Sequence, residues 1–151
     1  MNKKPFSPEE FKEIYSRATR LCVDLVIKTP KGLALSLRSL SSWKGYWHLP
    51  GGTVFYKEKI IDTVRRVALE ELGISVNVDK LLGYVEYVSE EKERGFGYTV
   101  AMVFLCSLGK DKIDMKSNEE ASEVSFFKEL PDNVIDEQRV FLESVWREIN
   151  I

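Results

Sequence analysis

Residues 52–74 read GTVFYKEKIIDTVRRVALEELGI and contain the most informative pattern of the chain. From about position 57 to position 72, apolar residues recur at helical spacing, at positions 60, 61, 64, 68 and 72. Gly73 then supplies a helix stop. Before the stretch, Pro50 leads into Gly51 and Gly52, where the free backbone favours a turn. The sequence therefore predicts a turn, a helix and a second turn.

The predicted helix contains two adjacent carboxylates, Glu70 and Glu71. Residues three and four apart share a helix face, so both project near each other and beside Val67. Adjacent carboxylates repel each other unless a positive charge lies between them, and a hard cation such as Mg²⁺ or Mn²⁺ prefers such oxygen ligands. Arg66 can orient Glu70 or neutralise part of its charge, because it lies four residues earlier. For an isolated helix a solvated charged face is the simpler interpretation, but the fixed spacing of the flanking residues favours a metal site.

The whole stretch resembles the Nudix box, a loop–helix–loop signature written G-x5-E-x7-R-E-U-x-E-E-x-G-U, in which U is aliphatic. Gly52, Glu58, Arg66 and Gly73 occupy its fixed positions, together with the two carboxylates. The family has a glutamate after the arginine, whereas this chain has Val67. The resemblance implies a metal-dependent hydrolase of diphosphate compounds. It also implies that Gly52, Glu58 and Gly73 support the structure of the box.

The resemblance covers most of the chain. Residues 45–52, GYWHLPGG, resemble the family's G-x-W-x-L-P-G-G, and residues 123–130, EVSFFKEL, resemble its later E-x-x-F-F-x-x-x-L element. The implied fold is α+β, a mixed β-sheet sandwiched between helices, in a single domain over residues 1–151. We expect residues 1–20 to form an N-terminal helical extension, because Ser7-Pro8-Glu9-Glu10 has the pattern of a capping box.

The order of the remaining elements agrees with an α+β fold. Apolar runs predict strands at residues 21–28, 33–38, 76–88, 98–108 and 123–127. Residues 29–32 and 89–97 are predicted turns, and residues 136–149 form an amphipathic helix. Mixed strands surrounding one central helix do not fit a regular alternation of strand and helix.

Val67 makes the chain similar to one branch of the family, the GDP-mannose mannosyl hydrolases, which have an aliphatic residue at this position. That branch has an aspartate within a strand of the type found here around Asp24, and an arginine before a G-Y-W triplet, here Arg38. In that branch water attacks the sugar carbon, which implies a nucleoside diphosphate and a free sugar as products. Two features differ: this chain has Thr53 where the branch has an arginine, and it lacks the histidine base of the loop before the later strand.

A carboxylate of that loop can replace the missing base. Glu120 is our prediction for this role, with Glu119 close behind, and a solvated acidic loop is the alternative for both. The single histidine, His48, lies in a different segment, near the expected metal site. We interpret His48 as a residue of the pocket wall that contacts the substrate rather than as a catalyst.

Three further residues are predicted to bind the substrate. Arg38 can bind a phosphate group in a bidentate manner, with an exposed strand-end charge as the alternative. Asp24 lies inside an apolar strand, where a charge is costly unless it is paired or functional, so a substrate contact and a buried partner are both open. Tyr46, like Trp43 and Trp47, can stack on a nucleobase, although Trp47 fits a core position better.

The predicted mechanism uses one or more Mg²⁺ (or Mn²⁺) ions held by Glu70, Glu71 and the backbone carbonyl of Gly51. Glu71 and Arg66 are the predicted catalytic residues of the box. Arg66 adds positive charge where negative charge develops, with help from Arg38.

The composition narrows the partners to small molecules. The net charge is −2, and no basic stripe favours a nucleic-acid polymer. No run of about 18 apolar residues predicts a membrane span, and the first residues lack the apolar core of a signal peptide. Cys22 and Cys106 lie in apolar runs and are predicted to be reduced, which indicates a cytoplasmic protein. The N-terminal helix has an apolar stripe that would suit a homodimer contact.

Three functions remain open at this point. The first is hydrolysis of a nucleotide sugar such as GDP-mannose at the sugar carbon. The second is cleavage at phosphorus, as in a pyrophosphohydrolase of nucleoside triphosphates or dinucleotides. The third is a binding or sensor domain that has lost activity at position 67. The retention of Glu70 and Glu71 argues against the third, because a retired site has no reason to keep two repelling carboxylates.

Overall fold

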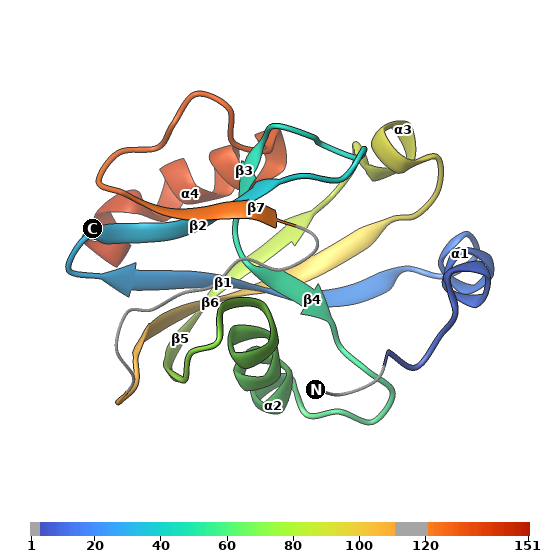
Figure 1. Ribbon diagram of the computed structural model, residues 1–151, viewed down its shortest axis with the longest axis horizontal. Helices are drawn as coiled ribbons and strands as arrows, with labels where there is room; N and C mark the ends of the chain where they lie inside the picture. Colours follow the sequence, from blue (N-terminus) through green and yellow to red (C-terminus); the bar gives the residue numbers. More distant parts are fainter. Residues whose placement is uncertain (1–3, 111–120) are drawn as a thin grey trace.

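The computed structural model of the chain describes residues 4–110 and 121–151, except for the side chains of residues 121 and 122. A mixed seven-stranded sheet forms its centre, with helices on both faces (Figure 1). The strands are β1 (Arg20–Thr29), β2 (Gly32–Arg38), β3 (Trp47–His48), β4 (Gly51–Thr53), β5 (Val76–Glu86), β6 (Thr99–Leu108) and β7 (Ala121–Phe127). The helices are α1 (Pro8–Tyr15), α2 (Ile60–Val67), its π-helical continuation η1 (Ala68–Leu72), α3 (Glu90–Arg94) and α4 (Asp136–Ile149).

β1 lies at the centre of the sheet and is covered on both faces. Its side chains alternate between the two faces, as strand geometry requires. Val23, Leu25 and Ile27 belong to the core under α2, whereas Cys22 and Val26 belong to the core under α4. This confirms the predicted α+β fold with a mixed sheet between helices.

The sheet opens at one end because β1 and β2 pair only next to their hairpin turn, through Lys28 with Leu33 and Thr29 with Gly32. Beyond that point β1 pairs with β4 on one side and in parallel with β6 on the other. β2 instead pairs with β3 and β7. The start of β1 and the end of β2 are therefore separated, and this separation positions the cleft described below.

Most predicted elements are present, and the differences are local. The terminal helix has the predicted bounds, and Ser7 forms a capping box with Glu10 at the start of α1. The predicted turn at 89–97 contains the short helix α3, which sequence analysis missed. The box helix begins at Ile60, three residues later than predicted, and changes to a π-helical turn after Val67.

Both cysteines are buried and free, as predicted. Burial raises the pKa of the Cys22 thiol to about 11 and that of the Cys106 thiol to about 12. Within the described residues, no helix has the length and apolar character that crossing a bilayer requires.

Candidate active site

A cleft of about 720 Å³ lies where β1 and β2 separate. One wall comes from β1, β4 and the box helix, and the other from β2, β3 and α4, while α1 closes the far end. Small-molecule sites occupy roughly 300–1,000 Å³, so the cleft has room for a nucleotide. The cleft brings together most of the residues that the sequence singled out: Asp24, Arg38, His48, Gly51, Gly52, Arg66, Glu70 and Glu71.

The box helix ends in a π-helical turn that contains both carboxylates. Glu70 and Glu71 belong to η1 and line the cleft, while Leu72 points into the core. Gly73 ends the turn in the left-handed conformation, with φ of 70°, which is why a glycine fits this position. π-helical turns are rare, interrupt α-helices and are frequent at functional sites.

Arg66 forms four hydrogen bonds that join separate parts of the box. Its Nε and Nη2 donate to the two carboxylate oxygens of Glu58 at 2.8 and 3.0 Å. Nη1 donates to Glu70 Oε2 at 3.2 Å, and Nη2 also donates to the backbone carbonyl of Thr53 at 2.7 Å. The guanidinium lies 3.7 Å from the centre of the Phe55 ring. Arg66 therefore fixes Glu70 with respect to the loop after β4.

Glu58 lies behind this contact rather than in the cleft. The hydrogen bonds from Arg66 lower the pKa of Glu58 to about 2, with smaller contributions from the backbone N–H of Phe55 and the hydroxyl of Thr63. Glu58 is therefore ionised throughout the neutral range and balances the charge of Arg66.

The residues at the box fit a divalent cation. Glu70 Oε2 is bonded to Arg66, but Glu70 Oε1 is buried and has no hydrogen-bond partner. A buried carboxylate oxygen without a partner is costly, and a cation beside it would remove that cost. Within residues 4–110 and 121–151 no group of three His, Cys, Asp or Glu side chains could hold a metal. Two carboxylates agree with Mg²⁺, which completes its coordination with water and phosphate oxygens.

Val67 occupies the position where the family has a glutamate, and it faces a tightly packed site. Its side chain is 1% exposed and belongs to the core under α2. A Cβ added to Gly52 would lie only 2.9 Å from Val67 Cγ2. The valine methyl groups therefore pack against the bare backbone of Gly52, and the box has no third carboxylate at this position.

Asp24 belongs to a buried chain of hydrogen bonds at the cleft wall. Tyr87 donates its hydroxyl to Asp24 Oδ2, and Gln138 Nε2 donates to the Tyr87 hydroxyl at 2.7 Å. Gln138 Oε1 in turn accepts from the backbone N–H of Leu49 at 2.7 Å. A Cβ on Gly51 would lie 2.3 Å from Asp24 Oδ1, so Asp24 lies directly against the loop that the metal prediction uses. Asp24 thus has a buried protein partner and also lines the cleft.

Burial raises the pKa of Asp24 to about 7, although the Tyr87 hydrogen bond opposes the shift. Between the ordinary pKa of about 3.9 and this value, the folded protein binds more protons than the unfolded chain. The stabilisation that comes from protonated Asp24 in the folded protein is therefore present below pH 4 and is lost as the pH rises towards 7.

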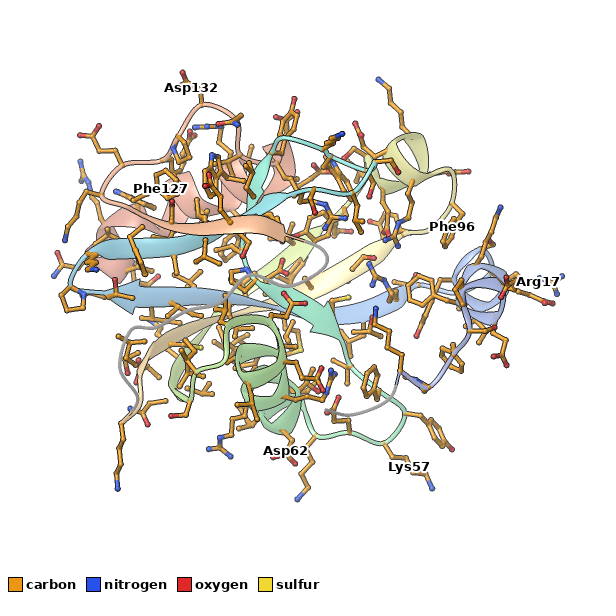
Figure 2. All side chains as sticks on the ribbon, in the orientation of Figure 1. Arg17, Lys57, Asp62, Phe96, Phe127 and Asp132 are labelled. Carbon is orange, nitrogen blue, oxygen red and sulfur yellow. The ribbon has the colours of Figure 1, made fainter. Side chains whose placement is uncertain are left out.

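We expect Asp24→Asn to remove this pH dependence, because asparagine cannot ionise but can still accept from Tyr87. Thermal unfolding at pH 4, 5.5 and 7 should show the variant gaining Tm relative to the native protein as the pH rises. The other titrating groups are common to both proteins and cancel in the difference. Asp62→Asn is the matched control, because Asp62 lies on the solvent side of α2 (Figure 2). A constant difference in Tm across the three pH values would contradict the expectation.

Of the three other residues predicted to bind the substrate, two line the cleft and one does not. Arg38 and His48 line the cleft, and Arg38 donates to the Ser42 carbonyl at 3.0 Å and to the Ser42 hydroxyl at 3.1 Å. Tyr46 is not among the residues that line the cleft. Trp43 lines it instead, with its ring 5.8 Å from the Arg38 guanidinium. Trp47 packs edge-on against Phe127 at 4.9 Å, in agreement with a core position.

The far end of the cleft contains residues that sequence analysis missed. Arg20 and Arg94 both pair with the buried Glu90, at 3.4 and 3.1 Å, and both lie near the Phe11 ring of α1. Phe11 also contacts Phe96 in the turn that approaches α1 (Figure 2). A charged residue followed by an apolar strand was the only sequence signal for Arg20.

Tyr87 and Gln138 were also missed, and only Gln138 had a readable signal. It occupies the apolar face of α4, four residues before the buried Leu142, and a polar residue at such a position requires a partner. Glu119 and Glu120, the predicted bases, lie outside the described residues.

Comparisons with known proteins agree with this geometry. The profile of the NUDIX domain matches residues 18–143. The chain is 34% identical over 110 residues to the low-salt glycan biosynthesis protein Agl8 of Haloferax volcanii, covering 71% of this chain and 70% of that protein. It is 29% identical over 122 residues to an ADP-ribose pyrophosphatase of Methanocaldococcus jannaschii, covering 80% and 69%. A MutT NUDIX hydrolase structure from Burkholderia pseudomallei superposes with a TM-score of 0.74 at 25% identity, covering 85% of this chain and 99% of that chain.

Proposed function

The chain belongs to the Nudix hydrolase family, and from this premise we propose that it hydrolyses a nucleoside diphosphate linked to another group, with a nucleotide sugar such as GDP-mannose as the first candidate. The observation that supports the proposal most strongly is the pair Glu70 and Glu71 on the cleft wall, with Glu70 Oε1 buried and unpaired. The cleft volume of about 720 Å³ suits a ligand of this size.

Each residue of the box has a role in this proposal. Glu70, Glu71 and the backbone carbonyl of Gly51 would hold Mg²⁺ (or Mn²⁺), which when bound neutralises the diphosphate and polarises its leaving oxygen. Arg66 holds Glu70 in place through Nη1, at 3.2 Å. Arg38, on the opposite wall, provides positive charge for the diphosphate.

The nucleotide-sugar assignment rests on two observations. The relative Agl8 is named for glycan biosynthesis, a process that consumes activated sugars. Val67 stands where the family has a glutamate, as in the branch that the sequence resembles, and its side chain packs against Gly52. Glu120 stays our prediction for the general base, on the resemblance alone.

Cleavage at phosphorus is the second candidate, favoured by the similarity to a protein named ADP-ribose pyrophosphatase. Hydrolysis in ¹⁸O-labelled water separates the two reactions. We expect mass spectrometry to find the label on the released sugar and none on the nucleoside diphosphate. Label on a phosphate group would contradict attack at carbon and would assign the enzyme to the pyrophosphohydrolases.

Three broader predictions accompany this proposal. We propose one domain over residues 1–151 with an extension at 1–20, in agreement with the profile match that begins at residue 18. The buried free thiols support a cytoplasmic location, since an oxidising compartment favours paired cysteines. A homodimer stays a prediction, although Phe11 of the apolar stripe already contacts Phe96 of its own chain.

A further inference from the structure

Two buried side-chain atoms in the described part of the chain lack a hydrogen-bond partner, and both belong to residues of the cleft: Glu70 Oε1 and His48 Nε2. Buried polar atoms are almost always bonded, so an atom without a protein partner calls for another one, such as a water, an ion or a ligand. The metal site accounts for Glu70. The proposed function has no role for His48 Nε2.

The hydrogen bond on the other side of the ring fixes what Nε2 can do. His48 Nδ1 lies 2.8 Å from the backbone carbonyl of Leu49. A carbonyl oxygen only accepts, so Nδ1 carries the hydrogen, and in the neutral ring Nε2 is a hydrogen-bond acceptor. Burial, together with the nearby charge of Arg38, lowers the pKa of His48 to about 4, which keeps the ring neutral at pH 7.

The ring is held on a rigid part of the fold. His48 lies in β3, opposite Ser36 of β2, and its side chain is 7% exposed. The next residue, Leu49, is fixed by the bond from its N–H to Gln138 Oε1, at 2.7 Å. A side chain positioned in this way can select among ligands, because little of its geometry changes on binding.

The chemistry of Nε2 excludes some parts of a nucleotide as its partner. A phosphate oxygen is itself an acceptor and would repel the lone pair of Nε2. A hydroxyl group is a neutral donor and would satisfy it. The diphosphate has Arg38 and the box for its charge, whereas the hydroxyls belong to the sugars on either side of it.

We propose that His48 Nε2 accepts a hydrogen bond from a sugar hydroxyl of the substrate and thereby determines which sugar the enzyme accepts. This proposal rests on the proposed function and deepens it. A site built to bond a hydroxyl discriminates strongly against the analogue that lacks it, because the protein atom is then left unpaired.

The test compares His48→Phe with the native enzyme on GDP-mannose and on analogues that each lack one hydroxyl. Phenylalanine keeps an aromatic ring at this position and removes the Nε2 acceptor, together with the Nδ1–H that donates to the Leu49 carbonyl. We expect KM for GDP-mannose to rise at least tenfold with a smaller change in kcat. With the native enzyme, KM for one deoxy analogue should exceed KM for GDP-mannose by the same factor. With the variant, the same analogue should show no further rise in KM. Analogues deoxygenated on the ribose and on the terminal sugar identify which sugar provides the hydroxyl.

Two further variants separate recognition from structure. His48→Gln places a carbonyl oxygen near the position of Nε2 and should restore part of the discrimination, which a purely structural role would not predict. Trp47→Phe changes packing on the same strand outside the cleft and should leave the discrimination unchanged.

Equal discrimination by the native enzyme and His48→Phe across the whole panel would overturn the inference. If the native enzyme hydrolyses nucleoside triphosphates and no nucleotide sugar, the proposed function fails. The ribose analogues of that triphosphate then test His48 by the same comparison.

Discussion

Glu71→Gln and Glu70→Gln are each expected to lower kcat/KM by about 10²–10³-fold, the loss that follows removal of one electrostatic contact to a transition state. An amide oxygen is a weaker ligand than a carboxylate oxygen, and Glu70 and Glu71 are the two carboxylates that the box places on the cleft wall. Glu70 has the more demanding environment, because its Oε1 is buried without a protein partner. Both residues line the cleft from the same π-helical turn.

Metal titration shows whether this loss comes from the cation. The Mg²⁺ concentration for half-maximal activity should rise in both variants, and Mn²⁺ binding followed by electron spin resonance should weaken in parallel. Glu93→Gln is the matched control, since Glu93 is exposed on α3 outside the cleft. Near-native activity of Glu71→Gln would show that the metal assignment is wrong.

Arg66→Met is expected to cost about 3 kcal/mol of stability, at the low end for breaking a buried ion pair. The low end applies because the side chains of the two partners, Glu58 and Glu70, remain 16% and 24% exposed to solvent. Removal of Arg66 leaves both carboxylates without their cation and frees the carbonyl of Thr53. A loss of this size lowers Tm by about 6–12 °C in a domain of this length.

Arg65→Met is the control for this prediction. Arg65 is the preceding residue of the same helix; its side chain is 63% exposed and pairs with Asp62 only at 4.0 Å. Its replacement should change stability by less than about 0.5 kcal/mol. Because Glu58 has a lowered pKa, its contribution is present above pH 4.5 and is lost as the pH falls towards 2, so the gap between Arg66→Met and the native protein should narrow in acid. Equal Tm losses for Arg65→Met and Arg66→Met would contradict this role of Arg66.

The sequence predicts the box well because the box is defined by the spacing of residues that are close together in the chain. Spacing alone placed Glu70 and Glu71 on one helix and its end at Gly73. The π-helical turn was not predictable, since one extra residue in a turn leaves no periodic trace in five residues. β3 and β4, with two and three residues, are too short for any alternation to be read.

The cleft depends on contacts between distant parts of the chain, and these were not predictable. Asp24, Tyr87 and Gln138 meet from β1, the end of β5 and α4, across 63 and 51 residues. The sequence left a substrate contact and a buried partner both open for Asp24, and the fold shows that Tyr87 is such a partner. Trp43 rather than Tyr46 borders the cleft, in a loop between β2 and β3 where Trp43 and Gly45 both have positive φ, 52° and 84°.

Metal-dependent hydrolysis of a nucleotide sugar is tested by product analysis after incubation of GDP-mannose with the native protein, in Mg²⁺ and in EDTA. We expect GDP and mannose in Mg²⁺ and intact substrate in EDTA, with the activity lost in Glu71→Gln. Substrate-induced thermal stabilisation without turnover of GDP-mannose, dinucleotides or nucleoside triphosphates, in Mg²⁺ or Mn²⁺, would contradict it and would indicate a binding domain.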